Sequence, residues 1–216
     1  MYFKVLLIME NKATYIKDLT EIRSMMERSS RFISLSGLSG IFAGIYALLG
    51  AWMGRQVVMG EIGANYQLKL LNLTSGRLEQ LIIIAVAVLI LTLSTGILLT
   101  TRKAKKKGLK IWDASARLMV INMLIPLATG GLLCLIFLYH HIIGVVAPCT
   151  LIFYGLALIN ASKYTFNDIR YLGFLEIILG LIAAFYVGYG IYFWAMGFGI
   201  LHILYGGIMY FKYERG

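Results

Sequence analysis

The chain has 216 residues, of which 60% are hydrophobic and 14% are charged, whereas about a quarter of the residues in a soluble domain are charged. A chain with so little charge cannot cover a folded core with a hydrated surface, so the composition excludes an ordinary water-soluble protein. The formal net charge of +10 is typical of basic residues gathered at membrane edges, and we do not expect nucleic acid as a partner.

Residues 1–31 form a polar N-terminal segment that we expect to lie in the cytoplasm. Four apolar residues recur in it at helical spacing with charged residues between them, which predicts a short amphipathic helix. They are Ile16, Leu19, Ile22 and Met26. Such a helix would lie on the inner membrane surface, cover the cytoplasmic ends of a bundle, or dock a partner protein. Because the polar sequence begins after Met9, we expect translation to start there.

Six long apolar segments follow, and they predict an all-α integral membrane protein with a six-helix transmembrane domain over residues 32–211. A helix needs about 20 apolar residues to cross about 30 Å of hydrocarbon, and only helices or closed barrels satisfy the backbone there. Barrel strands would alternate apolar and polar residues, and these segments do not. The predicted spans are residues 32–53, 81–100, 118–139, 142–159, 171–188 and 191–211, with a cytoplasmic tail over 212–216.

The basic residues orient the chain, because cytoplasmic loops of membrane proteins are rich in Lys and Arg. With six spans, all but three of the 20 Lys and Arg residues fall on the same side as both termini. The exceptions are Arg55, Lys69 and Arg77. This bias predicts a multi-pass protein with both termini in the cytoplasm.

Small residues spaced by four recur in the first and fifth spans, and we expect them to let helices pack closely, within the bundle or between two copies of the chain. They are Ser36, Gly40 and Gly44 in the first span and Gly180, Ala184 and Gly188 in the fifth. Pro126 and Pro148 lie inside spans and are expected to bend them. Cys134 and Cys149 form no metal-binding or CxxC pattern, so we expect them to serve packing alone.

A basic run follows the second span directly. It consists of Arg102, Lys103, Lys105, Lys106 and Lys107. The run predicts an anchor for anionic lipid headgroups, in which each basic residue contributes about 1 kcal/mol near an acidic surface. The alternative is a surface that faces a cytoplasmic protein partner.

Two ionisable residues lie inside predicted spans, where such residues are costly and usually functional. Glu176 and His202 lie about 9 Å and about 14 Å from the cytoplasmic ends of neighbouring spans, at a rise of 1.5 Å per residue. With three further polar residues they would form a polar cluster in the cytoplasmic half of the bundle. These three are Asn122, Ser94 and Thr95.

A structural role for the same two residues is the competing interpretation. Glu176 would then reach the headgroup region or pair with Arg170, and His202 would be neutral and bonded to a backbone carbonyl or a hydroxyl. We expect no metal site, because neither residue has a second His or carboxylate at i+3 or i+4.

The beginning of the first span carries a resemblance. Residues 25–40 read MMERSSRFISLSGLSG, and this stretch resembles the opening of a group of uncharacterised multispanning bacterial inner-membrane proteins. The resemblance implies a location in the bacterial inner membrane and a functional start at Met9. It implies no activity, cofactor or site residue.

The sequence contains no phosphate-binding loop, dinucleotide fingerprint or HExxH motif, so we expect a non-enzymatic protein without a cofactor or catalytic residues. The leading interpretation is a scaffold or regulatory protein that presents a basic cytoplasmic face to a protein partner or to anionic lipid. The alternative is a small, proton-linked transporter that uses Glu176 and His202, and an enzyme acting on lipid comes third. Replacing Glu176 by glutamine separates the first two, because only the transporter should lose its function.

Overall fold

The computed structural model describes residue 19 and residues 36–59 and 75–215, and the regular structure in these ranges is helical. A π-helical segment, η2 (Ala195–Leu201), joins α8 to α9, and a 3-10 turn, η1 (Ile143–Val145), precedes α6. The helices are α2 (Gly37–Met59), α4 (Ser75–Lys106), α5 (Ala114–Tyr139), α6 (Val146–Ala161), α7 (Asp168–Phe185), α8 (Gly190–Trp194) and α9 (His202–Tyr213). The predicted N-terminal helix and the start at Met9 lie outside the described residues.

Five stretches are long and apolar enough to cross a membrane, so the protein is a multi-pass membrane protein. They are Gly37–Met59, Gly76–Lys106, Ala114–Tyr139, Ile143–Ala161 and Gly190–Tyr213, and they match five of the six predicted spans. The remaining predicted span, 171–188, falls on α7. This helix has 18 residues that include Asp168, Arg170 and Glu176, whereas each of the five contains an 18-residue window with at most two charged residues.

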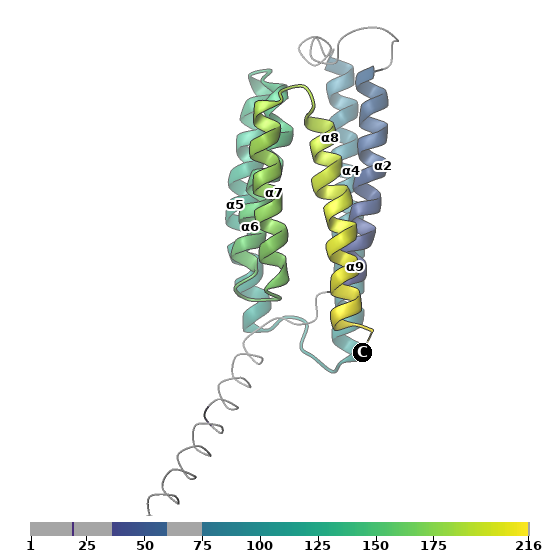
Figure 1. Cartoon of the computed structure of the whole chain (residues 1–216), viewed down its shortest axis with the longest axis vertical. Helices are drawn as coiled ribbons and strands as arrows, with labels where there is room; N and C mark the ends of the chain where they lie inside the picture. The colour runs from purple at the N-terminus through teal and green to yellow at the C-terminus, as the bar shows by residue number, and fades with distance from the viewer. Residues whose placement is uncertain (1–18, 20–35, 60–74, 216) are drawn as a thin grey trace, which may run out of the picture. The chain divides into compact units, whose positions relative to one another are not determined.

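Successive long helices run in opposite directions and fall into two groups (Figure 1). In one group α6 packs against α5 and α7, and in the other α2 packs against α4 and the continuous stretch of α8, η2 and α9. The groups meet where α8 contacts α6 and α7 and where η2 and α9 contact α7. This line of contact is called the seam below.

Glycines allow close helix crossings in both groups. Gly40 and Gly44 of α2 face α9 and η2, where a Cβ on Gly40 would lie 3.1 Å from the Cα of Gly206. A Cβ on Gly44 would lie 2.5 Å from the carbonyl oxygen of Gly199. Gly180 of α7 lies just as close to α6. These three glycines therefore have the packing positions that the sequence predicts for them.

Two residues expected to pack helices have other positions. Ala184 is exposed, whereas its neighbour Ala183 is fully buried. Gly188 lies beyond the end of α7, in a turn where its φ is 104°, a left-handed conformation that glycine adopts without strain. A stripe at strict four-residue spacing is therefore wrong for α7, because a helix of 3.6 residues per turn buries Gly173, Glu176, Gly180 and Ala183 instead.

Local features explain where two of these helices begin. Asp113 caps α5, since its side chain accepts a hydrogen bond from the backbone N–H of Ala116 at 2.6 Å. Pro148 lies in the first turn of α6, where its missing N–H removes no bond within the helix, so the expected bend is not required there. Cys134 and Cys149 are buried and form no disulfide bond.

Candidate functional site: a buried carboxyl–imidazole pair at the seam

Glu176 is the most unusual residue of the bundle. It lies on the inward face of α7 and its exposed fraction is 0%. Neither carboxylate oxygen has a hydrogen-bond partner among the described residues, although buried polar groups in folded proteins nearly always have one. The expected alternative, a pair with Arg170, is not formed, because the exposed Arg170 guanidinium lies 5.4 Å from the ring centroid of Phe174.

His202 reaches the same place from the first residue of α9. Its Nδ1 lies 3.5 Å from Oε1 of Glu176 and 3.0 Å from the carbonyl oxygen of Gly197. Its Nε2 lies 2.8 Å from the hydroxyl of Tyr154 on α6. A neutral imidazole satisfies both short contacts, with Nδ1–H donating to Gly197 and Nε2 accepting from Tyr154. The structure thus brings together the two ionisable residues that the sequence singles out.

The π-helical segment η2 shapes the site. Single π turns in helices are rare and are often found at functional positions. Gly197 lies in η2, and a Cβ added there would collide with Oε2 of Glu176 and lie 2.5 Å from Cδ2 of Leu151. Glycine at this position therefore provides the space in which the Glu176 carboxylate is buried.

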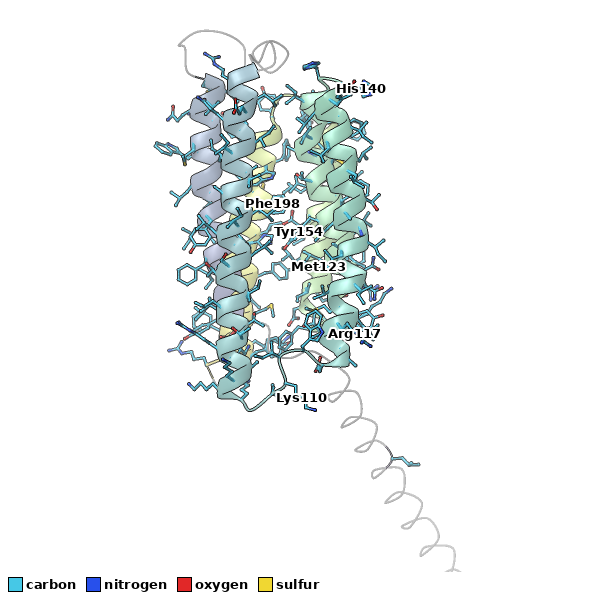
Figure 2. The ribbon with its side chains drawn as sticks, turned by 180° about the vertical axis from the view of Figure 1, so that it is seen from behind. Lys110, Arg117, Met123, His140, Tyr154 and Phe198 are labelled. Carbon is cyan, nitrogen blue, oxygen red and sulfur yellow. The ribbon has the colours of Figure 1, made fainter. Side chains whose placement is uncertain are left out.

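Aromatic rings line the seam beside the pair. Phe198 of η2 and Tyr154 of α6 face each other across it (Figure 2), with ring centroids 5.0 Å apart. Phe198 also stacks on His202 at 5.9 Å and contacts Trp194 at 5.1 Å. Tyr154, Phe198 and Trp194 are not among the site residues predicted from the sequence. The signal for the latter two was present, because Trp194, Phe198 and His202 recur at intervals of four residues and so share one helix face.

The other expected members of the polar cluster lie elsewhere. Asn122 donates to the carbonyl of Leu118 on its own helix at 2.8 Å. The hydroxyl of Thr95 lies 3.3 Å from that of Tyr46, and Ser94 is exposed. The prediction of a five-residue cluster is corrected here, because α4 packs on α2 and α5 packs on α6, so neither helix brings these residues to the pair.

The arrangement suits the binding of a proton or another cation. An ionised Glu176 would be a poorly compensated charge among apolar side chains, the state that low-dielectric surroundings penalise most. One bound proton removes that charge. In the described part of the chain, no group of three or more His, Cys, Asp and Glu side chains is placed to hold a metal ion.

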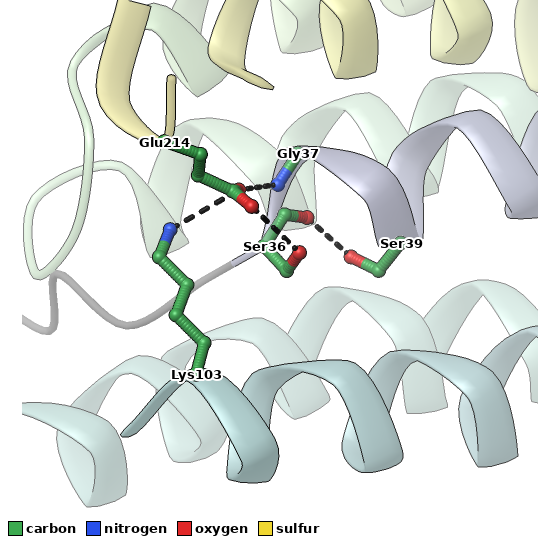
Figure 3. A network of polar contacts seen from close by, with 5 residues as sticks. All are labelled: Ser36, Gly37, Ser39, Lys103 and Glu214. Atoms are coloured by element: carbon green, nitrogen blue, oxygen red, sulfur yellow. Dashed lines mark hydrogen bonds and ion pairs between the residues drawn. The ribbon is translucent and has the colours of Figure 1, made fainter. Parts of the chain in front are cut away.

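A second polar network closes the end of the bundle that carries the basic run (Figure 3). The carboxylate of Glu214 accepts hydrogen bonds from the backbone N–H of Gly37, from Lys103 Nζ at 3.1 Å and from Ser36 Oγ at 3.3 Å. Glu214 therefore caps α2 from the far end of the chain, where a negative charge also suits the helix dipole. The sequence analysis missed Glu214, because nothing local pairs it with a residue 177 positions away.

The basic run divides accordingly. Arg102, Lys105, Lys106 and Lys107 are exposed, as contact with lipid or a partner requires. Lys103 instead turns inward to Glu214, so its expected outward role is corrected.

An ion pair joins the two helix groups at this end. Lys212 Nζ lies 2.9 Å from Oδ2 of Asp168, which also accepts a hydrogen bond from the Tyr213 hydroxyl at 2.7 Å. Burial raises the pKa of Asp168, but hydrogen bonds from Lys212 and Tyr213 and the charge of Lys212 outweigh this and leave the pKa below its ordinary value. The pair links the start of α7 to the end of α9.

Comparisons with known protein families, with curated proteins and with solved structures gave no match. The resemblance of residues 25–40 to an inner-membrane group therefore stays a prediction.

Proposed function

We propose that the protein is a small proton-linked transporter with six membrane-spanning helices and both termini in the cytoplasm, in which Glu176 carries the proton. The observation behind this proposal is a fully buried carboxylate that has no hydrogen-bond partner among the described residues and lies 3.5 Å from an imidazole nitrogen. Ionisable residues at such depth in membrane proteins commonly belong to proton relays. The sequence alone favoured a scaffold over a transporter, and this proposal reverses that order.

The course of the helices supports a sixth span and this orientation. α7 runs the length of the bundle between its neighbours (Figure 1), and counting it as a span returns the chain to the starting side. Lys110 and Arg117 lie at one end of the bundle and His140 at the other (Figure 2). The end with the basic residues would face the cytoplasm, following the positive-inside rule.

The location of Glu176 at the seam supports transport over a purely structural role. Many secondary transporters alternate access by moving one helix group against another around a fixed site near the bilayer midplane. Here Glu176 belongs to the α5–α6–α7 group and His202 to the α2–α4–α8–α9 group. A small separation of the groups would part the pair and expose the carboxylate to water.

A charge-movement measurement tests the proposal without knowledge of the substrate. Right-side-out and inverted membrane vesicles are adsorbed on a solid support, and the transient current after a pH jump is recorded for the native chain, Glu176→Gln and Glu79→Gln. Glu79 is an exposed residue of α4 and serves as the matched control. We expect a current in both vesicle orientations that disappears in Glu176→Gln and persists in Glu79→Gln.

Two results would contradict the proposal. A current that survives in Glu176→Gln would remove this carboxylate from the proton pathway. A Glu176-dependent current in only one vesicle orientation would make the site a one-sided proton sensor instead of a transporter element.

The scaffold interpretation remains a separate prediction, because its docking helix belongs to residues 1–31, outside the described residues. Deletion of residues 11–31 followed by affinity purification from native membranes tests it. Loss of a stoichiometric soluble partner on deletion would support docking, and purification of only this chain with lipid would contradict it.

A further inference from the structure

We infer that Glu176 binds a lipophilic organic cation in competition with the proton, so that the exchanged substrates are hydrophobic monovalent cations of the quaternary ammonium or phosphonium kind. This inference rests on the proposed proton-linked transport and adds its substrate class.

Charge is the first consideration. In the described residues, the partner that Glu176 has within ion-pair distance is His202, whose hydrogen bonds to Gly197 and Tyr154 a neutral ring satisfies. Burying one isolated charge in a low-dielectric interior is far costlier than burying a neutralised one. When the proton leaves, another cation must therefore replace it.

The surroundings select the kind of cation. Alkali and divalent metal ions prefer a shell of several oxygen ligands, whereas the carbonyl of Gly197 is already engaged by His202 and the rest of the surroundings is largely aromatic or aliphatic. Aromatic faces attract cations, most strongly where water is excluded. A cation with an apolar surface and no tightly held water fits the rings of Tyr154 and Phe198, which pack against His202, better than a hydrated metal ion does.

Aromatic side chains continue from His202 along the neighbouring turns of η2 and α8. Trp194, Phe198 and His202 follow one another along the face of α8, η2 and α9, with centroid separations of 5.1 Å and 5.9 Å. A separate surface groove, nearer the end of the bundle away from the basic run, is lined by Tyr186, Tyr189, Tyr192, Phe193 and Met196. A lipophilic cation would collect in this groove and would reach Glu176 when the two helix groups separate at the seam.

The exchange balances with one carboxylate. Glu176 holds either one proton or one monovalent cation, so each complete cycle moves one proton in one direction and one cation in the other and transfers no net charge. The transient current after a pH jump therefore reports the entry of the proton to the buried carboxylate and not the exchange itself. The titratable groups that face Glu176 are His202 from α9 and Tyr154 from α6. Both keep the same protonation state throughout the cycle.

Binding of tetraphenylphosphonium to the purified full-length protein tests the inference. Titration calorimetry and proton release are measured together in weakly buffered detergent solution. We expect one proton to be released for each cation bound. Over the pH range where the site is protonated, the affinity for the cation should fall about tenfold for each unit by which the pH is lowered. Tetraphenylborate, which has the same shape and the opposite charge, should not bind.

Variants locate the site. Glu176→Gln should abolish proton release and binding. Phe198→Leu should weaken binding by about tenfold, whereas Phe185→Leu, at an aromatic residue that is 88% exposed, should leave binding unchanged. Equal binding of tetraphenylborate, or equal binding to Glu176→Gln, would show simple partition into apolar surface and overturn the inference.

The two proposals can fail separately. Absence of tetraphenylphosphonium binding, together with a Glu176-dependent pH-jump current in both vesicle orientations, would overturn the substrate class and leave proton-linked transport standing. Absence of the current would overturn proton-linked transport, and the substrate class with it.

Discussion

Replacing Gly197 by alanine should destabilise the protein through the buried carboxylate. The added methyl group would collide with Oε2 of Glu176 and lie 2.5 Å from Cδ2 of Leu151. Glu176 and Leu151 are both 0% exposed, so neither side chain has solvent to move into. The loss of stability should therefore come from the packing around Gly197, and a glycine-to-alanine exchange elsewhere in a helix should not cause it.

The magnitude follows from two opposing contributions. Inserting a methyl group into a packed core costs about 1–3 kcal/mol, whereas exchanging glycine for alanine in a helix stabilises it by about 0.5–1 kcal/mol. Gly207 of α9 is the matched control, because a Cβ added there meets nothing within 4 Å. Gly197→Ala should thus be about 1–3 kcal/mol less stable than Gly207→Ala, a difference of about 2–12 °C in unfolding midpoint for a chain of this size.

Thermal unfolding in detergent micelles, followed by circular dichroism, measures this difference. The double variant Glu176→Ala with Gly197→Ala should recover most of the loss, because the smaller side chain vacates the space that the methyl group needs. If Gly197→Ala melts at the same temperature as Gly207→Ala, or if the double variant shows no recovery, the packing of Glu176 against Gly197 is refuted.

Three further predictions concern the carboxylates. Glu176→Leu should raise the unfolding free energy by about 1–3 kcal/mol while it removes the pH-jump current, since it replaces a buried group without a hydrogen-bond partner in the described part of the chain. A less stable variant would show that the carboxylate is satisfied. Glu214→Ala should lower the unfolding free energy by about 0.5–2 kcal/mol through loss of the α2 cap. Arg215→Ala, at the exposed neighbouring residue, is the control and should change the unfolding free energy little. Equal effects of the two substitutions would argue against capping by Glu214. The lowered pKa of Asp168 means that its stabilising contribution is complete above its ordinary pKa of 3.8 and is lost as pH falls through the lower folded value. The difference in melting temperature between the native chain and Asp168→Asn should therefore shrink in acid, and a difference independent of pH would contradict this.

The apolar segments and the pairing of Glu176 with His202 follow from the sequence for a physical reason. Membrane helices have fixed rise and must cross a fixed thickness, so residue depth can be counted along each segment. Only Tyr189 and Gly190 separate the predicted spans 171–188 and 191–211, so these spans had to be antiparallel neighbours. In the structure the link is residues 186–189, between α7 and α8. Similar depth on neighbouring helices indicated that the two side chains could meet, and the structure places them 3.5 Å apart.

The partners of the other helices could not be predicted in this way. Segments that are apolar all round do not reveal which face meets another helix. Asn122 and Thr95 therefore looked like members of the cluster because their depth is near that of Glu176, although α5 and α4 hold them away from the pair. The same ambiguity misplaced Ala184 by one residue relative to the buried Ala183.

Contacts between distant ends of the chain were also beyond sequence reasoning. Glu214 looked like one residue of a short polar tail, yet it caps α2 and pairs with Lys103. The π turn of η2 left no trace in the sequence apart from Gly197 and Gly199.

An infrared titration tests most directly whether Glu176 is an exchangeable buried acid. Difference spectra between acidic and alkaline pH would be recorded for the full-length native protein in lipid and for Glu176→Gln. The predicted result is a carboxylic-acid carbonyl band, typical of a group with weak or no hydrogen bonding, that appears and disappears with pH in the native protein and is absent from Glu176→Gln. A native spectrum without this band, or the same band in the variant, would contradict the assignment of Glu176 as the proton-carrying group.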